Sequence, residues 1–159
     1  MALICLLKRK IVAQFKLCIN SIHGIKHWKN VERIGKYLTK RNGADFEIVR
    51  LFAYLHDSKR ENDDHDSEHG LRASKFVKKL YGKKLLNISE KQLEQLIFAC
   101  KHHSNPSAKN DNATIQTCWD ADRLDFWRLG ERPEKDLLYT DIAKQDKTIE
   151  FARKINLCN

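Results

Sequence analysis

A chain of 159 residues that is 42% hydrophobic and 32% charged has the composition of one soluble globular domain, not of a disordered protein. Six glycines and two prolines leave few sites for tight turns, which favours long helices over many short strands. The net charge of +9 implies attraction to anions. Because the lysines and arginines are spread along the chain without a nucleic-acid-binding motif, nucleic acid is a partner that the sequence allows but does not favour.

Five cysteines, an odd number without a Cys-x-x-Cys pair, stand mostly in apolar surroundings at positions 5, 18, 100, 118 and 158. This usage is typical of reduced thiols in an intracellular protein. The apolar residues 1–7 precede the basic residues 8–10, which is the reverse of the order in a signal peptide. No apolar stretch approaches the roughly 18 residues of a membrane span, so we expect a cytoplasmic protein without one.

The first two elements are expected to be helices. Apolar residues recur at helical spacing over residues 2–19, so residues 1–20 are predicted as a helical segment that covers the core. A second helix is predicted over residues 24–41, ending at Asn42-Gly43. His27 lies beside the apolar stripe of this helix and is expected to face inward.

Asp45 is expected to cap a third helix with a strongly apolar face. The apolar pattern ends at Asp57, so His56 and Asp57 fall at the C-terminal end of a buried helix. The acidic stretch that follows, residues 61–66, lacks the glycine that an EF-hand loop needs at its sixth position, and we interpret it as a solvated loop.

Four more helices complete the predicted fold. One opens at residue 66 or 67 and runs to about residue 81, and the next begins with a Ser89–Gln92 capping box and ends in His102-His103. The sixth covers residues 115–129 and places Asp122 among aromatic side chains, and the last is capped by Thr140 and covers residues 140–155. No strand is predicted, so residues 1–159 are expected to form an all-α, single-domain bundle of about six to seven helices.

Four polar residues lie on or at the end of the predicted apolar faces: His27, His56, Asp57 and Asp122. A single histidine in such a position is more often a hydrogen-bonded core residue than a metal ligand. Four buried polar groups from three helices each require a partner, however. Imidazole and carboxylate together suit a divalent ion, so the sequence predicts a site for Zn, Mn, Ni, Fe, Co or Mg.

The local contexts of these residues are His23-Gly24-Ile25-Lys26-His27, Leu55-His56-Asp57-Ser58 and Asp120-Ala121-Asp122-Arg123-Leu124. In this order they resemble the HD-domain superfamily of metal-dependent phosphohydrolases, over roughly residues 21–141. Members of that superfamily are all-helical and hold a metal with a histidine, a His-Asp pair and a distant aspartate. The resemblance is to a small single-domain bacterial branch, whose members are mostly described only as predicted hydrolases.

The resemblance implies that His27, His56, Asp57 and Asp122 are the metal ligands, with Asp120 and Asp125 as alternatives to Asp122. His69 and His103 resemble positions that some members use around the metals or the phosphate. If both reach the centre, the site holds two metals bridged by Asp57. Otherwise they surround a single metal and contact the phosphate, which is the arrangement that we expect. His23, His65 and His102 are not expected to be ligands.

The implied function is hydrolysis of a phosphate ester of a small phosphorylated metabolite, with a nucleotide favoured, by metal-activated water. Lys59, Arg60 and Arg123 stand beside the ligands in sequence and are candidate catalytic and phosphate-binding residues. The two arginines are preferred because they offer bidentate geometry. Asp63 is a candidate for orienting the attacking water, and Asp57 is assigned to the catalytic centre.

Three other functions are compatible with the same residues. They are a nucleotide-binding or regulatory protein with weak catalysis, a nucleic-acid-associated phosphodiesterase, and an oxygenase like some relatives with paired iron. The Gly-Tyr-Pro signature of the cyclic-dinucleotide branch is absent. Arg60-Glu61 stands where the guanosine-tetraphosphate branch has a Glu-Asp pair, which argues against that activity.

Overall fold

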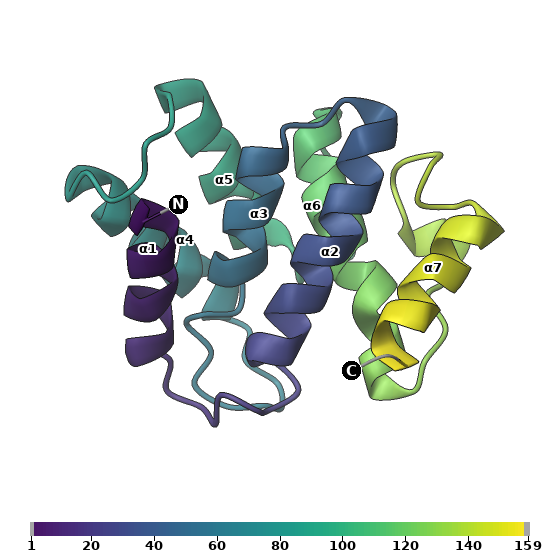
Figure 1. Cartoon of the computed structure of the whole chain (residues 1–159), viewed down its shortest axis with the longest axis horizontal. Coiled ribbons are helices and arrows are strands. Elements are labelled where there is room, and N and C mark those ends of the chain that lie inside the picture. Colours follow the sequence, from purple (N-terminus) through teal and green to yellow (C-terminus); the bar gives the residue numbers. More distant parts are fainter. Residues whose placement is uncertain (1, 158–159) are drawn as a thin grey trace.

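The computed structural model describes residues 2–157, with side chains from Leu6 onward, and over these residues the chain forms helices and no strand (Figure 1). In chain order the elements are α1 (Ala2–Ala13), α2 (Ile25–Asn42), α3 (Phe46–Leu55), α4 (His69–Gly82), α5 (Glu90–His102), α6 (Ala113–Leu124), the 3₁₀ helices η1 (Asp125–Leu129) and η2 (Lys135–Leu137), and α7 (Asp146–Leu157). The predicted all-α fold class is therefore confirmed.

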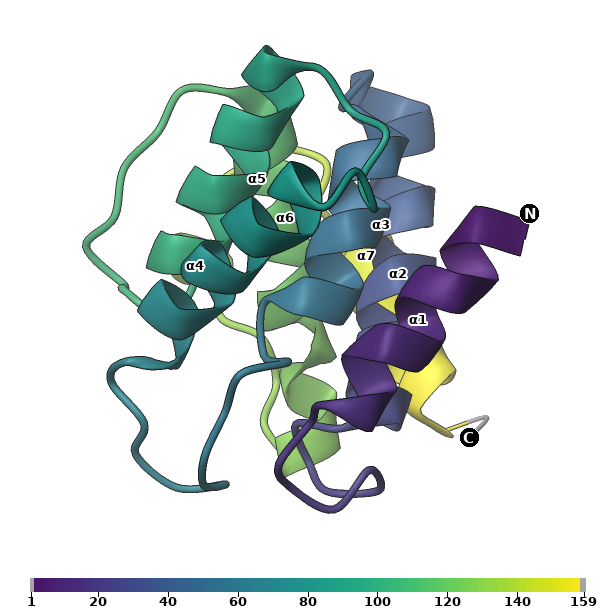
Figure 2. The same ribbon diagram turned by 90° about the vertical axis from the view of Figure 1, so that its left-hand side faces the viewer.

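Helices α2 and α3 form a central pair, α4 and α5 form a second pair, and α6 packs against α2, α3 and α5. Helices α1 and α7 lie at opposite ends of the long axis of the molecule, α1 against α3 and α7 against α2 (Figure 1). Seen from the side, α1 crosses in front of the central pair (Figure 2). Within the described part of the chain, no helix has both the length and the apolar character needed to cross a membrane.

The central pair is close because Gly35 of α2 faces Val49 of α3. A β-carbon on Gly35 would lie only 2.4 Å from Cγ1 of Val49. The predicted apolar stripe of α2 is fully buried, and its Trp28 meets the rings of Phe15 and Tyr54 edge-on. This close packing brings the start of α2, with His27, next to the end of α3, with His56.

Two predicted helix caps are present. Asp45 accepts hydrogen bonds from the backbone N–H groups of Glu47 and Ile48, and Ser89 with Gln92 forms the capping box of α5. These short-range signals are reliable because the side chain satisfies backbone donors that the helix itself leaves free.

Four predicted helix boundaries differ from those of the structure. Helix α4 begins at His69 and not at 66 or 67, because the carboxylate of Asp66 pairs with Arg72 instead of capping the helix. Helix α7 begins at Asp146 and not at 140. Thr140 caps only a single turn, in which its hydroxyl accepts from the backbone N–H of Ala143 at 3.3 Å while it donates to Asp120 at 2.6 Å.

The third error is at α1, which ends at Ala13 and not at residue 19. Residues 14–24 form a series of turns, in which the backbone N–H of Ile25 donates to the carbonyl of Ile19 at 2.9 Å. The predicted helix over 115–129 also differs, since it changes to 3₁₀ geometry at Asp125.

Cys100 and Cys118 are buried, Cys18 is exposed, and none of these three forms a disulfide. The side chain of Cys5 and the whole of Cys158 lie outside the described residues.

Candidate metal centre

The C-terminal end of α3 brings His56 and Asp57 into the core. The backbone N–H of His56 still donates to the carbonyl of Phe52 at 3.0 Å, and the His56 ring stacks on the Phe52 ring at a centroid distance of 4.7 Å. His56 is fully buried and Asp57 is 3% exposed. Because α3 ends here, the adjacent side chains of His56 and Asp57 can both reach the same site.

One set of side chains, the first ligand group, consists of His27 from α2, His56 after α3 and Asp122 from α6. The Nε2 atoms of the two histidines are 3.0 Å apart. Oδ1 of Asp122 is 3.2 Å from Nε2 of His27 and 3.6 Å from Nε2 of His56. Oδ2 of Asp57 faces the same point, at 3.6 and 3.5 Å from these nitrogens.

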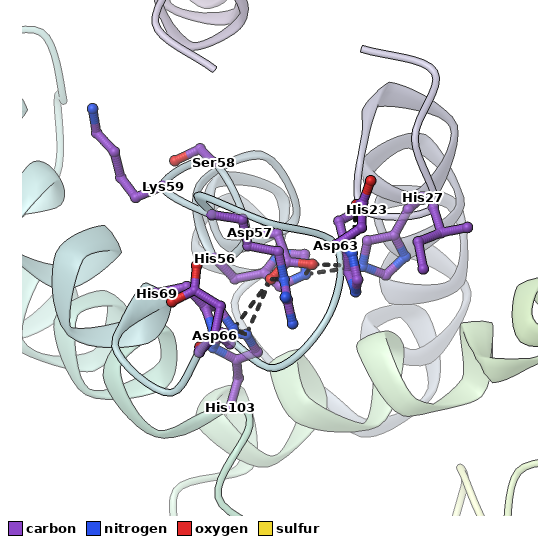
Figure 3. Close-up of polar contacts among 12 residues, drawn as sticks. His23, His27, His56, Asp57, Ser58, Lys59, Asp63, Asp66, His69 and His103 are labelled. Carbon is purple, nitrogen blue, oxygen red and sulfur yellow. Dashed lines mark hydrogen bonds and ion pairs between the residues drawn. The ribbon is translucent and has the colours of Figure 1, made fainter. Parts of the chain in front are cut away.

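A second ligand group consists of His69 at the start of α4 and His103 at the end of α5. Their Nε2 atoms are 2.8 Å apart. Both face the other oxygen of Asp57, Oδ1, at 3.3 and 3.4 Å. Figure 3 shows Asp57 between the two groups, with His69 and His103 on one side and His27 on the other.

The four imidazoles are held in one tautomer. Each uses its Nδ1 atom for a bond to a protein acceptor: His27 to Oδ2 of Asp125, His56 to the carbonyl of Phe52, His69 to the carbonyl of Asp66, and His103 to the carbonyl of Cys100. A carbonyl oxygen can only accept, so Nδ1 carries the proton and donates it. In the neutral ring Nε2 then carries a lone pair, and all four lone pairs converge on one carboxylate.

This donor set fits divalent metal ions. Acceptor atoms that face one another at about 3 Å in a buried site repel unless a cation lies between them. Bonds of about 2.0–2.1 Å to a tetrahedral zinc would separate its ligand atoms by about 3.3–3.4 Å. The separations of 2.8–3.6 Å within the two groups lie around that value. Asp57 contributes one oxygen to each group.

The charges of the centre agree with this interpretation. Burial alone would raise the pKa of Asp57, but the surrounding His56 and His103 hold it well below its usual range. Burial likewise opposes ionisation of Asp122, whereas the adjacent rings of His27 and His56 keep the pKa of Asp122 well below normal. Burial and the neighbouring His103 lower the pKa of His69 to about 4, so its ring is neutral near pH 7.

His27 differs from His69. Burial would lower its pKa, but the adjacent carboxylates of Asp122 and Asp125 raise it. The carboxylates of Asp122 and Asp125 therefore favour a positive charge at the His27 ring. A proton on the ring is the smallest cation that can supply this charge.

The two alternative ligands named from the sequence, Asp120 and Asp125, have other roles. Asp125 accepts from Nδ1 of His27 at 2.7 Å through one oxygen. Through its other oxygen it accepts from the side-chain amides of Asn30 and Asn156, at 2.9 and 2.8 Å. Asp125 thus orients a candidate ligand, as carboxylates commonly do behind metal-bound histidines.

Asp120 faces away from the centre and binds the segment before α7. Its two oxygens accept from the backbone N–H groups of Tyr139 and Thr140 at 2.7 and 2.8 Å, and from the Thr140 hydroxyl. Burial raises its pKa in spite of these bonds.

The second ligand group depends on a close approach of α4 and α5. A β-carbon on Gly70 would lie 2.8 Å from the carbonyl oxygens of Cys100 and Lys101, so only glycine permits this contact. The loop before α4 is held by Arg72, which donates to both oxygens of Asp66 at 2.6 and 2.5 Å. Together these contacts place the ring of His69 against that of His103.

A cavity of about 370 Å³ opens onto the centre, and both Asp57 and Asp122 line it. The predicted arginines Arg60 and Arg123 line it as well. Nε of Arg60 donates to Oδ1 of Asp57 at 3.1 Å, and Nη1 of Arg123 donates to the carbonyl of Leu137.

Two other predicted residues lie elsewhere. The ammonium group of Lys59 lies 4.4 Å from the centre of the Phe76 ring and does not line the cavity, and Figure 3 shows this side chain directed away from the ligand groups. Asp63 does not line the cavity either, but its Oδ1 lies 3.0 Å from Nδ1 of His23, which does.

Sequence reasoning missed His23 and Arg128 as parts of the site, and it named Asp125 only as an alternative metal ligand. His23 was set aside, although it is buried to 7% exposure and lines the cavity. Arg128 also lines the cavity, while its Nε donates to the carbonyl of Ile22 at 3.0 Å. The only sequence feature that pointed to Arg128 is its position three residues after Asp125, on the same short helix.

Comparison with known proteins agrees with the fold. No protein-family model matches the chain, and no curated protein sequence matches it. The crystal structure of a predicted HD superfamily hydrolase from an uncultured Thermotogales bacterium superposes with a TM-score of 0.69 and 21% sequence identity, over 94% of this chain and 84% of that one. The chain therefore has the fold of that protein.

Proposed function

We propose that the chain is an HD-superfamily, metal-dependent phosphohydrolase that cleaves phosphate esters of small metabolites. The observation that carries this proposal is the convergence of four imidazole Nε2 atoms on the two oxygens of Asp57, beside a cavity with arginines in its wall. The structural likeness to a predicted HD superfamily hydrolase supports it.

The donor set has room for two divalent ions, one more than we expected from the sequence. The first ligand group with Oδ2 of Asp57 would hold one ion, and the second ligand group with Oδ1 would hold the other. Nitrogen and carboxylate donors suit Zn, Mn, Fe, Ni or Co. When bound, such ions lower the pKa of a water molecule and polarise a phosphoryl oxygen.

The arginines of the cavity would bind the phosphoryl group. Nη1 of Arg123 donates one hydrogen bond to the carbonyl of Leu137, and the Nε and Nη2 atoms of Arg123 remain for a ligand. Arg60 is held against Asp57 and against the carbonyls of Asn62 and Asp64, so it contributes charge more than new bonds. These positive charges would stabilise the negative charge that develops on the phosphoryl oxygens.

His23 would bind or move a proton at its Nε2 atom. Its Nδ1 faces Asp63, which fixes the ring and leaves Nε2 as the atom for a substrate oxygen or a water molecule. Burial lowers the pKa of His23, so this ring is neutral near pH 7. Asp63 would act through His23 and not directly on water.

The size of the cavity favours a small substrate over a nucleic acid. A volume of about 370 Å³ lies at the lower end of the range of roughly 300–1,000 Å³ for small-molecule sites. A small phosphate ester of up to about the size of a mononucleotide is therefore the substrate class that we propose.

Elemental analysis of four purified variants tests the metal assignment. Asp57→Ala is expected to lose both metals, since each ligand group uses one of its oxygens. His56→Ala and His103→Ala are each expected to lose one metal. His102→Ala is the matched control, because His102 adjoins His103 but packs against the ring of Phe98 and does not line the cavity, so its metal content should stay unchanged.

Activity is tested by incubating the metal-loaded protein with a panel of phosphate esters and assaying released phosphate. Turnover that falls at least about 100-fold in Asp57→Ala is expected, because that variant loses the chemistry of both ions. Full metal content in both His56→Ala and Asp57→Ala would refute the metal site. Metal-loaded protein that binds nucleotides but turns over no ester would make it a binding protein instead.

A further inference from the structure

Resting on the function proposed above, we infer that the cavity selects phosphate monoesters whose organic group is apolar close to the phosphate. Polyol phosphates and polyphosphates would then be poor ligands. The juxtaposition that carries this inference is the presence of four apolar side chains in the lining of the same small cavity as residues of both ligand groups.

The apolar wall consists of four side chains that line the same cavity as Asp57, His69 and His103: Pro106, Phe126, Leu129 and Leu137. Leu129 and Leu137 are 42% and 41% exposed, and they are among the few large hydrophobic side chains that the described part of the chain leaves exposed. Exposed apolar side chains scattered over a surface need no explanation, but two that share a concave wall beside a reactive centre form a binding surface.

The wall is held in place and does not belong to a free loop. The backbone N–H of Gly130 donates to the carbonyl of Trp127 at 3.1 Å, and Gly130 adopts a φ of 79°, which turns the chain sharply after Leu129. On the other side, Arg123 binds the carbonyl of Leu137, and Asp120 anchors the residues that follow. The organic group of a substrate would therefore meet a preformed surface, which lowers the entropic cost of binding.

The polar groups of the cavity are too few for a heavily hydroxylated ligand. Apart from the two ligand groups and Asp57, the polar lining consists of His23, Ser104 and three arginines. No asparagine, glutamine or threonine lines this cavity, so several hydroxyl groups would lose their bonds to water without replacement. An apolar group loses no such bonds.

The positive charge of the cavity suits one phosphate and not a chain of them. No lysine lines the cavity, and each of its three arginines already donates to the protein: Arg60 to Asp57, Arg123 to Leu137 and Arg128 to Ile22. A polyphosphate would place further charges against the apolar wall, where they would lack partners.

Two phosphonates of the same charge test the inference without turnover. Benzylphosphonate and methylphosphonate present the same phosphoryl group and differ in the apolar group alone. By titration calorimetry of the metal-loaded protein, benzylphosphonate should bind about tenfold more tightly, the effect expected from burying most of a phenyl ring.

The variant Leu129→Ser/Leu137→Ser should lose most of this preference and keep its affinity for methylphosphonate. Both side chains are partly exposed, so the fold should tolerate the change, and metal content confirms that the centre is intact. Leu6→Ser is the matched control, since Leu6 is 45% exposed on α1 and does not line the cavity. It should leave both affinities unchanged.

Hydrolysis of benzyl phosphate and glycerol phosphate separates the two proposals, because both esters release a primary alkoxide. Equal affinity for the two phosphonates, with hydrolysis of both esters, would overturn the apolar selection and leave the phosphohydrolase intact. A metal-loaded protein that binds neither phosphonate and hydrolyses neither ester would overturn the proposed function itself.

Discussion

Gly70 lies directly against the carbonyl oxygen of Cys100, and a β-carbon at this position would come within 2.8 Å of it. The contact joins the first turn of α4 to the last turn of α5, the two turns that carry His69 and His103. A single hydrogen atom in place of a methyl group thus decides whether two candidate ligands can meet.

Gly70→Ala is therefore expected to remove the second metal and retain the first. The added methyl group must push α4 away from α5, at a cost of about 1–3 kcal/mol in the free energy of unfolding. Metal stoichiometry should fall from two ions to one by elemental analysis. Gly82→Ala, at the other end of α4, is the control, since its β-carbon would meet nothing within 4 Å. Two bound ions in Gly70→Ala would show that the close approach does not matter.

Asp125→Asn should weaken metal binding at the first ligand group by about 10–100-fold. Asp125 accepts from His27 with one oxygen and from Asn30 and Asn156 with the other. An asparagine at position 125 must turn its NH₂ group toward one of its two sets of donors. Either the His27 ring or the amides of Asn30 and Asn156 then lose their acceptor. The dissociation constant of the first metal, measured by competition with a chelator, reports the effect.

Asp120→Asn is the control for Asp125→Asn, because it should lower the stability of the fold without changing the metal affinity. Its carboxylate joins α6 to Tyr139 and Thr140, so the variant should unfold at a lower urea concentration and keep its metal affinity. Loss of metal affinity in Asp120→Asn alone would reverse the roles assigned to these two carboxylates.

The pairing of Asp66 with Arg72 should make part of the stability depend on pH. Burial would raise the pKa of Asp66, but Arg72 and the backbone N–H of Glu61 lower it below its usual value of 3.8. Folding therefore favours the ionised form, so this contribution is present above about pH 4. It disappears as the pH falls through the lower pKa of the folded state.

Urea unfolding of the wild type and Asp66→Asn between pH 2.5 and about 6 checks this prediction. The wild type should be more stable near pH 6, and the difference should shrink toward the acid end. Every other titratable group is common to both proteins, so the difference between the two isolates Asp66. Asp64→Asn, an exposed neighbour in the same loop, should match the wild type. A difference that stays constant with pH would contradict the prediction.

Ile11→Ala tests the covering role expected for α1. Ile11 is 1% exposed, so the variant should lose about 2–5 kcal/mol in the free energy of unfolding. Val12 is 37% exposed on the neighbouring position, and Val12→Ala should change stability by less than about 0.5 kcal/mol. Both variants should retain their metals, because α1 contributes no residue to either ligand group.

The elements that the sequence predicted well share a local cause. The stripe of α2, the Asp45 cap and the Ser89 capping box depend on residues within a few positions of one another. His56 and Asp57 could be placed at the end of α3 for the same reason, since the apolar pattern stops beside them.

The parts that could not be predicted depend on what lies opposite in space. Asp120, Asp122 and Asp125 are all buried, and their spacing along the chain does not reveal that one faces Thr140, one the histidines and one Asn156. The early end of α1 and the late start of α7 are different, because local turns replace the predicted helix over residues 14–24 and after Thr140.

The bond between Asn156 and Asp125 connects the C-terminal helix to the orientation of His27. Asn30 and Asn156 meet on this carboxylate although 126 positions separate them in the chain. The ligand groups themselves come from residues 27–122, so α7 supplies no candidate ligand. Through Asn156 it still helps to fix the carboxylate that orients the His27 ring, so the C-terminal helix supports a centre to which it contributes no donor atom.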